Sequence, residues 1–296
     1  MPNKKCLPYL HTLVIPFLKN LSYFYPKLNR MKTKICIAGA TGKMGSHLSK
    51  AIAETADMTI VSALAKNYNQ QDLGTVLNLK NIDAQIFDDI IFALKKKPEI
   101  LIDFTHAEVV KRNVIYAIQE KVNVVIGTSG LTESDFEEIN ALALENGVGV
   151  IAAGNFSLSA VLMMQFAEMA AKHFPSWEII EYSYDGKPDA PSGTANELAG
   201  RLAKIKLPEQ KVPLNNVVGK TESCGANVEG TQIHAVRLPG FNNSCEIIFG
   251  TGAERLKIRH DAIDPTKPYI DGALLAMRKV NGLKGLYRGL DAVMKL

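Results

Sequence analysis

Short apolar runs alternate with helical patterns through the first half of the chain. Each apolar run ends in glycine or polar residues, and the runs cover residues 34–38, 58–64, 99–105, 122–130 and 148–155. Residues 46–53 and 109–120 between them have the spacing of helices. Buried strands that alternate with helices predict an α/β fold with a doubly wound parallel sheet of Rossmann type. Residues 66–75 predict a polar loop, followed by an amphipathic run to Leu94.

The pattern changes after Asn155. An apolar helix is predicted at 160–172, a strand at 177–184, a second helix to about Lys204, and strand-like runs at 231–249 and 255–260. We interpret residues 156–265 as a separate α+β domain and residues 31–155 as the Rossmann-type domain. Residues 266–296 are expected to return to that first domain, with helices at 270–280 and 285–296. Three methionines at helical spacing are predicted to be packing residues, namely Met163, Met164 and Met169.

The first thirty residues differ from the rest and explain the basic charge. They contain five cationic and no acidic residues, whereas the whole chain has a net charge of +4, so the remainder is close to neutral. Nucleic acid is therefore not an expected partner. The apolar run at 7–17 is interrupted by His11 and Pro16, which argues against a membrane span, and it lacks the marks of a targeting peptide. We expect residues 1–30 to lie outside the fold, with Met31 as the true start.

Three glycines follow the first predicted strand. Gly39, Gly42 and Gly45 are three residues apart, and a helical pattern follows them. In a dinucleotide site such glycines allow a tight turn, the approach of a pyrophosphate to the backbone, and close packing of helix on sheet. The alternative is a glycine-rich turn without a ligand. We predict a nicotinamide dinucleotide site at the carboxyl edge of the sheet, which also gathers residues 103–105, 127–130 and Asn155.

The end of the second predicted strand bears on the choice of nucleotide. An NAD site usually has an acidic residue about twenty positions after the glycines. This chain has Lys66 there instead. A cation suits the 2′-phosphate of NADPH, so we expect NADPH to be preferred over NADH, although Lys66 read alone is also an ordinary solvated lysine.

The segment 187–194 predicts a site for an acidic small molecule. Lys187 comes shortly before a small-residue turn, and Thr194 followed by Glu197 has the spacing of a capping box. The free backbone N–H groups of the first helical turn, the Ser192 and Thr194 hydroxyls and the Lys187 ammonium would then converge on a carboxylate. The alternative is an ordinary capped helix after a proline-rich loop. We favour a functional role for Lys187 over this alternative, because a cation near a helix N-terminus is unfavourable until an anion arrives.

Cysteines and histidines do not suggest a metal or a disulfide framework. Cys6, Cys36, Cys224 and Cys245 form no CxxC pair, and no two of the histidines are four residues apart on a helix. Free thiols in a reducing cytoplasm are the simplest account, and no metal site is predicted.

In this order, the motifs resemble those of the dihydrodipicolinate (4-hydroxy-tetrahydrodipicolinate) reductases of lysine and diaminopimelate biosynthesis. The resemblance covers nearly all of residues 31–296 and rests on the segments 39–45, 103–105, 127–130, 153–157 and 187–195. It implies a Rossmann domain that binds NADPH or NADH, a second domain that binds a small cyclic dicarboxylate and builds a homotetramer, and a cytoplasmic enzyme.

The resemblance also assigns residues. Cofactor contact is expected, together with Lys66, at Gly39, Thr41, Gly42, Lys43, Met44, Gly45, Asp103, Phe104, Thr105, Gly127, Thr128, Ser129, Asn155 and Phe156. Substrate contact is expected at Lys187, Ser192, Gly193, Thr194 and Arg237.

One departure concerns the proton donor. Family members usually carry a His-His pair just before the lysine, whose first histidine is the presumed acid, but here Ser183 and Tyr184 stand at those positions. Ser183 is a poor acid, so Tyr184 or Lys187, directly or through water, is the alternative. A second departure is the segment 239–246 after Arg237, which replaces the family's Gly-Glu-His. One of Tyr182 and Tyr184 is alternatively a packing residue, Asp189 a turn residue, and Arg237 a surface cation.

These departures leave two alternative functions. One is a related imine or amino-acid dehydrogenase acting on another small carboxylate. The other is a regulator that binds NADPH without catalysis, against which the intact segment 187–194 argues.

Overall fold

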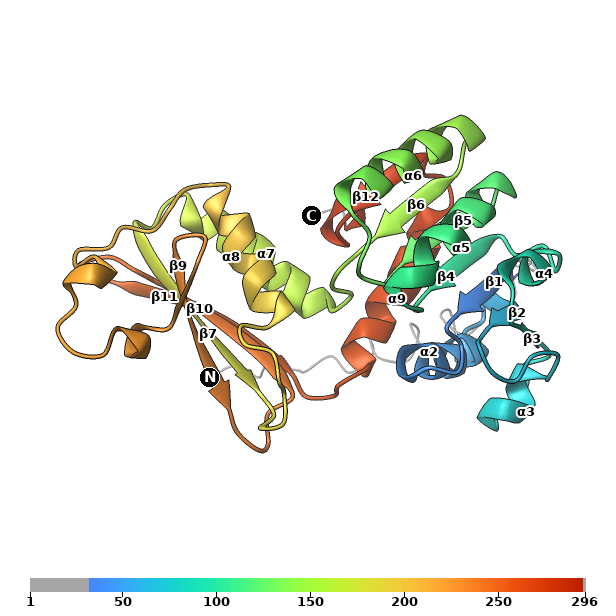
Figure 1. Ribbon diagram of the computed structural model, residues 1–296, viewed down its shortest axis with the longest axis horizontal. Coiled ribbons are helices and arrows are strands. Elements are labelled where there is room, and N and C mark those ends of the chain that lie inside the picture. Colours follow the sequence, from blue (N-terminus) through green and yellow to red (C-terminus); the bar gives the residue numbers. More distant parts are fainter. Residues whose placement is uncertain (1–31, 295–296) are drawn as a thin grey trace, which may run out of the picture. The chain divides into compact units, whose positions relative to one another are not determined.

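A computed structural model describes residues 32–294 of the chain (Figure 1). The expectations for residues 1–30, Cys6 included, lie outside this part. The chain from Thr33 onward forms one compact unit. No helix among the described residues combines the length and the apolar character that crossing a bilayer needs.

The larger of the two sheets is parallel and has seven strands. Its strand order is β12-β6-β5-β4-β1-β2-β3. The strands are β1 (Thr33–Ala38), β2 (Met58–Leu64), β3 (Gln85–Phe87), β4 (Ile100–Asp103), β5 (Asn123–Ile126), β6 (Gly149–Ala152) and β12 (Gly285–Arg288). The order reverses between β1 and β4, which is the topological switch point where ligands of such sheets bind. The predicted doubly wound parallel sheet is therefore confirmed.

Helices cover both faces of this sheet (Figure 1). They are α2 (Lys43–Glu54), α3 (Leu73–Leu77), α4 (Ile90–Leu94), α5 (Ala107–Gln119), α6 (Glu133–Asn146) and α9 (Lys267–Val280). Alternate residues of β1 enter opposite layers, as the period of a strand requires: Ile35 and Ile37 join the core with α2 and α9, whereas Cys36 and Ala38 join the core with α5 and α6.

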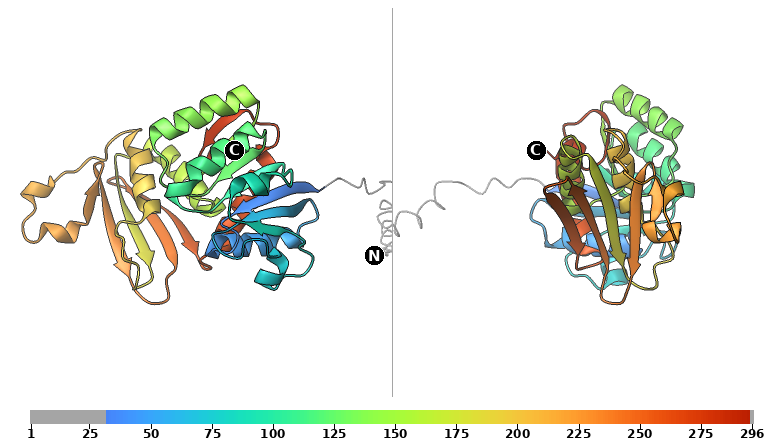
Figure 2. Two further views of the ribbon diagram at one scale, coloured as in Figure 1. Left: turned by 45° about the vertical axis from the view of Figure 1, so that its right-hand side comes forward. Right: turned by 90° about the vertical axis from the view of Figure 1, so that its left-hand side faces the viewer.

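The second sheet is mixed and has five strands. Its order is β11-β10-β7-β9-β8, and only the β7–β9 pair is parallel. The strands are β7 (Ser176–Ser183), β8 (Ala226–Val228), β9 (Thr231–Arg237), β10 (Asn243–Gly250) and β11 (Arg255–Ala262). Helices α7 (Leu158–Ala171) and α8 (Gly193–Ala203) pack on one face, and the right view of Figure 2 shows the strands in front of them. Short 3₁₀ turns lie at Leu214–Asn216 and Thr221–Cys224.

Two expectations about local structure were wrong, and one short strand was not predicted. Residues 285–294 are not helical: they form β12, which pairs with β6, and a 3₁₀ turn η4 (Asp291–Val293). Gly285 and Gly289 adopt φ values of +79° and +85°, which interrupt a helix. The amphipathic run to Leu94 contains the three-residue strand β3, which was not predicted. Met163 and Met164 are buried, but Met169 is 59% exposed and is not a core residue.

Candidate functional site

The glycine turn after β1 is closed so tightly that side chains cannot enter it. Gly39 has a φ of +80°, and a Cβ atom there would lie 2.3 Å from the Phe104 carbonyl oxygen. A Cβ on Gly45 would lie 2.1 Å from the Gly39 carbonyl oxygen, so α2 packs directly on the turn. Gly42 is the N-cap of α2 and supplies no side-chain cap. The first-turn N–H groups of α2 are therefore available to an anion.

The residues next to this turn differ in exposure. Thr41 is half-buried, Lys43 is exposed, and Met44 packs against the core under α2. Lys66 is exposed just after β2, the strand that pairs with β1. Lys66 therefore lies after the strand that neighbours β1, the strand that leads into the glycine turn.

Asp103 at the end of β4 is a fully buried carboxylate. Its Oδ1 accepts hydrogen bonds from the Thr105 backbone N–H at 2.9 Å and from the Thr128 hydroxyl at 2.7 Å. Its Oδ2 accepts from Asn113 Nδ2 at 2.9 Å. A carboxylate satisfied in this way holds the loops after β4 and β5 together, and it is not exposed to a ligand.

The loops after β4, β5 and β6 meet at one edge. The Phe104 ring lies against Gly127, where a Cβ would be 2.1 Å from Cε1, and it contacts the buried Phe156 ring edge-on at 5.7 Å between centroids. Ser129 is exposed. Asn155 is buried, and its Oδ1 accepts from the Ser157 backbone N–H at 2.9 Å. The predicted cofactor residues of these loops are brought together.

The N-terminus of α8 differs in detail from the sequence prediction. Ser192, not Thr194, is the N-cap, and its hydroxyl accepts from the Ala195 backbone N–H at 3.3 Å. The Thr194–Glu197 capping box was therefore wrong by two residues, because Gly193 and Thr194 already belong to the helix. Thr194 instead faces the parallel sheet: Asn155 Nδ2 donates to its hydroxyl at 3.3 Å. This hydrogen bond joins the segment 187–194, the candidate anion-binding segment, to the loops after β1, β4, β5 and β6, the candidate nucleotide edge.

Lys187 pairs with Asp189 in the loop that precedes α8. The Lys187 ammonium donates to the Asp189 carboxylate, and the lysine side chain is only 16% exposed. The hydrogen bond and charge of Lys187 lower the pKa of Asp189. Asp189 is thus an ion-pair partner as well as a turn residue.

The predicted proton donors lie in different environments. Ser183 is 2% exposed and donates to Asn243 Oδ1 at 3.3 Å, so its hydroxyl is inside the protein. Tyr184 is 46% exposed. Tyr182 stacks on Phe241 at 5.1 Å between ring centroids and lies under the Arg259 guanidinium at 4.7 Å. Tyr182 is therefore the packing tyrosine of the pair.

Arg237 is not a free surface cation. Its Nη2 donates to Glu181 Oε1 at 2.6 Å and to the Asp189 carbonyl oxygen at 2.7 Å, and its Nη1 donates to the Val236 carbonyl oxygen at 3.1 Å. Its Nε is buried without a hydrogen-bond partner among the described residues. Arg237 belongs to the support of the segment 187–194.

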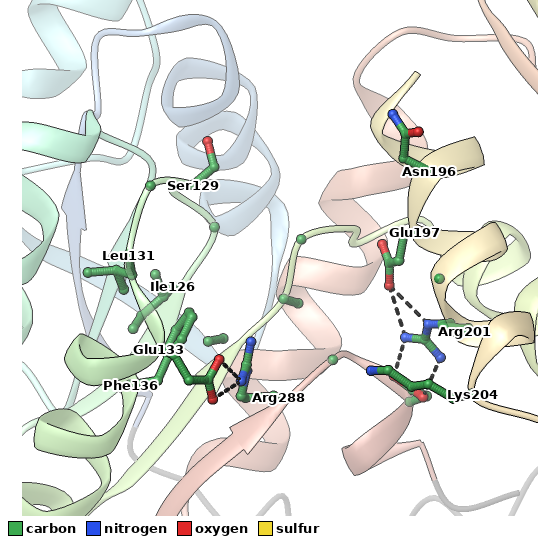
Figure 3. Close-up of a pocket in the computed structure, with 18 of the residues that line it drawn as sticks. Ile126, Ser129, Leu131, Glu133, Phe136, Asn196, Glu197, Arg201, Lys204 and Arg288 are labelled. Carbon is green, nitrogen blue, oxygen red and sulfur yellow. Dashed lines mark hydrogen bonds and ion pairs between the residues drawn. The ribbon is translucent and has the colours of Figure 1, made fainter. Parts of the chain in front are cut away.

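A cavity of about 1330 Å³ lies between the nucleotide edge and α8. Figure 3 shows Ser129, Ile126 and Arg288 on one side, and Asn196, Glu197 and Arg201 on the facing helix. The residues at 127–130 and Gly154 line it, but Lys187, Ser192, Gly193 and Thr194 do not. The cavity thus contains part of the predicted cofactor site, whereas the candidate anion-binding segment is not part of its wall.

Sequence reasoning missed the ionic network beside this cavity. Arg201 on α8 donates to Asp291 at 2.9 Å, to Glu168 on α7 at 3.2 Å and to Glu197 at 3.0 Å. Burial alone lowers the pKa of Arg201, but its hydrogen bond to Asp291 and the charges of Asp291 and Glu197 outweigh burial and raise it. Nothing local in the sequence reveals partners ninety positions apart.

Glu181 was also missed, although the sequence carries a signal for it. On β7 the buried face comprises Trp177, Ile179, Glu181 and Ser183, so an acidic residue occupies an inward position. Its Oε2 accepts from the Ser192 backbone N–H at 2.8 Å. A charged residue in an inward register of a strand is an informative anomaly, because such residues are buried only when they are paired.

A glycine turn at the switch point of a parallel sheet, joined by the Asn155–Thr194 hydrogen bond to a helix that packs on a second sheet, is the arrangement expected of dinucleotide-dependent oxidoreductases. Family models for the N-terminus and the C-terminus of dihydrodipicolinate reductase match residues 33–156 and 159–294. The chain therefore belongs to the dihydrodipicolinate reductase family, and this membership confirms the resemblance and the predicted enzyme class.

Individual relatives agree. The chain is 38% identical over 266 residues to the 4-hydroxy-tetrahydrodipicolinate reductase of Geobacillus thermodenitrificans. This alignment covers 90% of this chain and 100% of the relative. A dipicolinate-bound dihydrodipicolinate reductase from Paenisporosarcina sp. TG-14 superposes with a TM-score of 0.81 at 31% identity, covering 89% of this chain and 100% of the other. An amine dehydrogenase from Mycobacterium smegmatis shares the fold alone, at 14% identity and a TM-score of 0.64 over 90% and 98% of the chains.

Proposed function

We propose that this protein reduces 4-hydroxy-tetrahydrodipicolinate to tetrahydrodipicolinate with NADPH or NADH. The observation that carries the proposal is the Asn155–Thr194 hydrogen bond at 3.3 Å, which holds the anion-binding end of α8 against the nucleotide edge. A dicarboxylate held at α8 then lies next to that edge. A domain division after Asn155 and after residue 265 remains part of the proposal.

The residues of the nucleotide edge fit a dinucleotide. A Cβ on Gly39 or Gly45 would collide with backbone atoms, so only glycine fits at these two positions of the turn. The N-terminus of α2 has no side-chain cap, and its free N–H groups suit a pyrophosphate. The loops that Asp103 ties together, with Ser129 and Asn155, would hold the nicotinamide side. When bound, the nicotinamide supplies a hydride to the substrate. Asp103 itself acts by positioning, since its oxygens are occupied.

The preference for NADPH over NADH rests on Lys66. Lys66 is exposed just after β2, the strand that pairs with β1, and its charge suits a 2′-phosphate, whereas no acidic residue stands at this position to accept the ribose hydroxyl of NADH. This preference is testable by comparing kcat/KM for the two nucleotides.

The substrate carboxylates fit the end of α8. The backbone N–H groups of Gly193 and Thr194 lie in the first turn of α8, and the Lys187 ammonium is paired with Asp189 in the loop before this helix. One carboxylate would accept from these N–H groups and the Thr194 hydroxyl, and Lys187 would share its ammonium between Asp189 and the substrate. The positive end of a helix and a cation together favour an anion at this place.

Tyr184 is the proton donor that we favour, with Lys187 as the second candidate. After hydride addition, the adjacent carbon must accept a proton, and the donor has to reach the cleft. Tyr184 is exposed next to the anion-binding segment, whereas the hydroxyl of Ser183 is buried and engaged with Asn243. A cytoplasmic homotetramer completes the proposal, in line with the family resemblance.

Turnover with freshly made substrate tests the proposal. A dihydrodipicolinate synthase generates the substrate in the cuvette, and the absorbance of NADPH or NADH is followed with and without this protein. We expect turnover with both nucleotides, faster with NADPH, and inhibition by dipicolinate. Nucleotide binding without turnover would instead support a regulator, and turnover only with other imines would support a related dehydrogenase.

A further inference from the structure

We propose that Glu181 is a positioning residue that sets the geometry of the substrate-carboxylate site; the inference rests on the function proposed above. Glu181 lies on the buried face of β7 and is 1% exposed. Each of its two carboxylate oxygens has one partner. Oε2 accepts from the Ser192 backbone N–H at 2.8 Å, and Oε1 accepts from Arg237 Nη2 at 2.6 Å.

These two contacts hold the two ends of the short loop 189–192, one directly and one through Arg237. The Ser192 end leads directly into α8, whose first turn carries Gly193 and Thr194. At the other end, Arg237 Nη2 also donates to the Asp189 carbonyl oxygen at 2.7 Å. The Asp189 side chain in turn accepts from Lys187. One buried carboxylate therefore fixes, through two partners, the helix N-terminus and the loop that holds the lysine.

Arg237 also removes an electrostatic conflict. A buried carboxylate next to an anion site would repel an incoming dicarboxylate and lower its affinity. The guanidinium of Arg237 offsets this charge at 2.6 Å, so the field at α8 stays favourable for an anion. With Nη2 shared between Glu181 and Asp189, and Nη1 bonded to Val236, Arg237 acts as support. This revises the expectation that Arg237 contacts the substrate.

Removing the charge of Glu181 distinguishes a supporting role of Arg237 from direct contact between Arg237 and the substrate. In Glu181→Gln, the amide oxygen can still accept from the Ser192 backbone N–H, but the amide N–H₂ faces the donors of Arg237, so the loop loses the anchor that Arg237 provides. We expect KM for the substrate and Kd for dipicolinate to rise at least about tenfold, with kcat within about threefold and Kd for NADPH within about twofold. Glu178→Gln is the matched control, because Glu178 is an exposed glutamate on the same strand, paired only with His234 among the described residues.

Arg237→Met provides an independent variant should Glu181→Gln fold poorly, and thermal unfolding is recorded for each. Because the two residues act as one unit, the double variant Glu181→Gln/Arg237→Met should raise Kd for dipicolinate no more than the larger single change does. If Arg237 bound the substrate directly, Glu181→Gln would free it and leave Kd for dipicolinate unchanged or lower it, and that result overturns the inference. Loss of NADPH binding together with dipicolinate binding overturns it as well, since it shows a global effect.

The two proposals fail in different ways. A wild-type protein that binds NADPH and dipicolinate but reduces nothing contradicts the proposed function, whereas the Kd measurements on the Glu181 variants still decide the positioning role. A wild-type protein with normal turnover and a Glu181→Gln variant with unchanged KM contradicts the positioning role alone.

Discussion

The contact between Gly45 and the glycine turn makes a quantitative prediction. In Gly45→Ala, the new Cβ would lie 2.1 Å from the Gly39 carbonyl oxygen and 2.7 Å from Ala40 Cα. Both neighbours are backbone atoms, so α2 must move away from the turn. Helix propensity favours alanine by about 0.5–1 kcal/mol, but overpacking in a close-packed site costs about 1–3 kcal/mol or more. We expect a net loss of about 1–2 kcal/mol in the free energy of unfolding.

The displacement of α2 also spoils the nucleotide site. Because the N–H groups at the start of α2 must face the pyrophosphate, we expect NADPH affinity to fall at least about tenfold. Gly200→Ala on α8 is the matched control for stability, since its nearest neighbour outside the helix backbone is a carboxylate oxygen of the Glu229 side chain at 3.6 Å. That variant should gain up to about 1 kcal/mol. Urea unfolding and fluorescence titration measure both effects, and a Gly45→Ala protein as stable and as tight-binding as wild type refutes the reasoning.

Three further predictions concern single residues. Lys66→Ala should lower kcat/KM for NADPH at least about fivefold while leaving NADH nearly unchanged, because only NADPH carries the 2′-phosphate; equal losses for both nucleotides would remove the assignment. Burial lowers the pKa of His260 below 6.5, so the unfolded chain binds the proton more readily; this contribution to stability is present above pH 6.5 and is lost as the pH falls through the pKa of the folded state. Urea unfolding between about pH 5 and 7.5 should therefore show a weaker pH dependence in His260→Gln than in wild type, and identical slopes would contradict this. Burial raises the pKa values of the Cys36 and Cys245 thiols to about 12, so a thiol reagent at neutral pH should modify Cys224 in the folded protein and the other two only after unfolding. Peptide mapping by mass spectrometry checks this, and labelling of Cys36 as fast as Cys224 would be the contrary result.

The sequence was most informative where local pattern and chemistry coincide. Most strands of the parallel sheet are short apolar runs, and the glycine turn follows the first of them, so the place of this turn at the carboxyl edge of the sheet could be predicted. The second strand was predicted with its observed bounds, Met58–Leu64. These features depend on burial and backbone conformation, which neighbouring residues determine.

The features that were missed depend on distant partners. β12 is a strand because β6 offers it an open edge, which a local pattern in residues 285–288 does not reveal. Ser192 is the N-cap of α8 rather than Thr194, and its backbone N–H is anchored by Glu181 on another strand. The pairing of Arg237 with Glu181 likewise joins residues 56 positions apart. Periodicity can indicate that Glu181 points inward, but it cannot name the residues that Glu181 meets.

The most direct test of the account is the turnover of Lys187→Ala with substrate made in the cuvette. The central claim is that one fixed ammonium beside the end of α8 orients the dicarboxylate next to the nucleotide edge. The account predicts at least about a hundredfold loss of turnover with NADPH affinity within about twofold of wild type, while the exposed-lysine control Lys284→Ala behaves as wild type. A Lys187→Ala enzyme that keeps wild-type turnover and KM, or one that loses NADPH binding to the same degree, would contradict it.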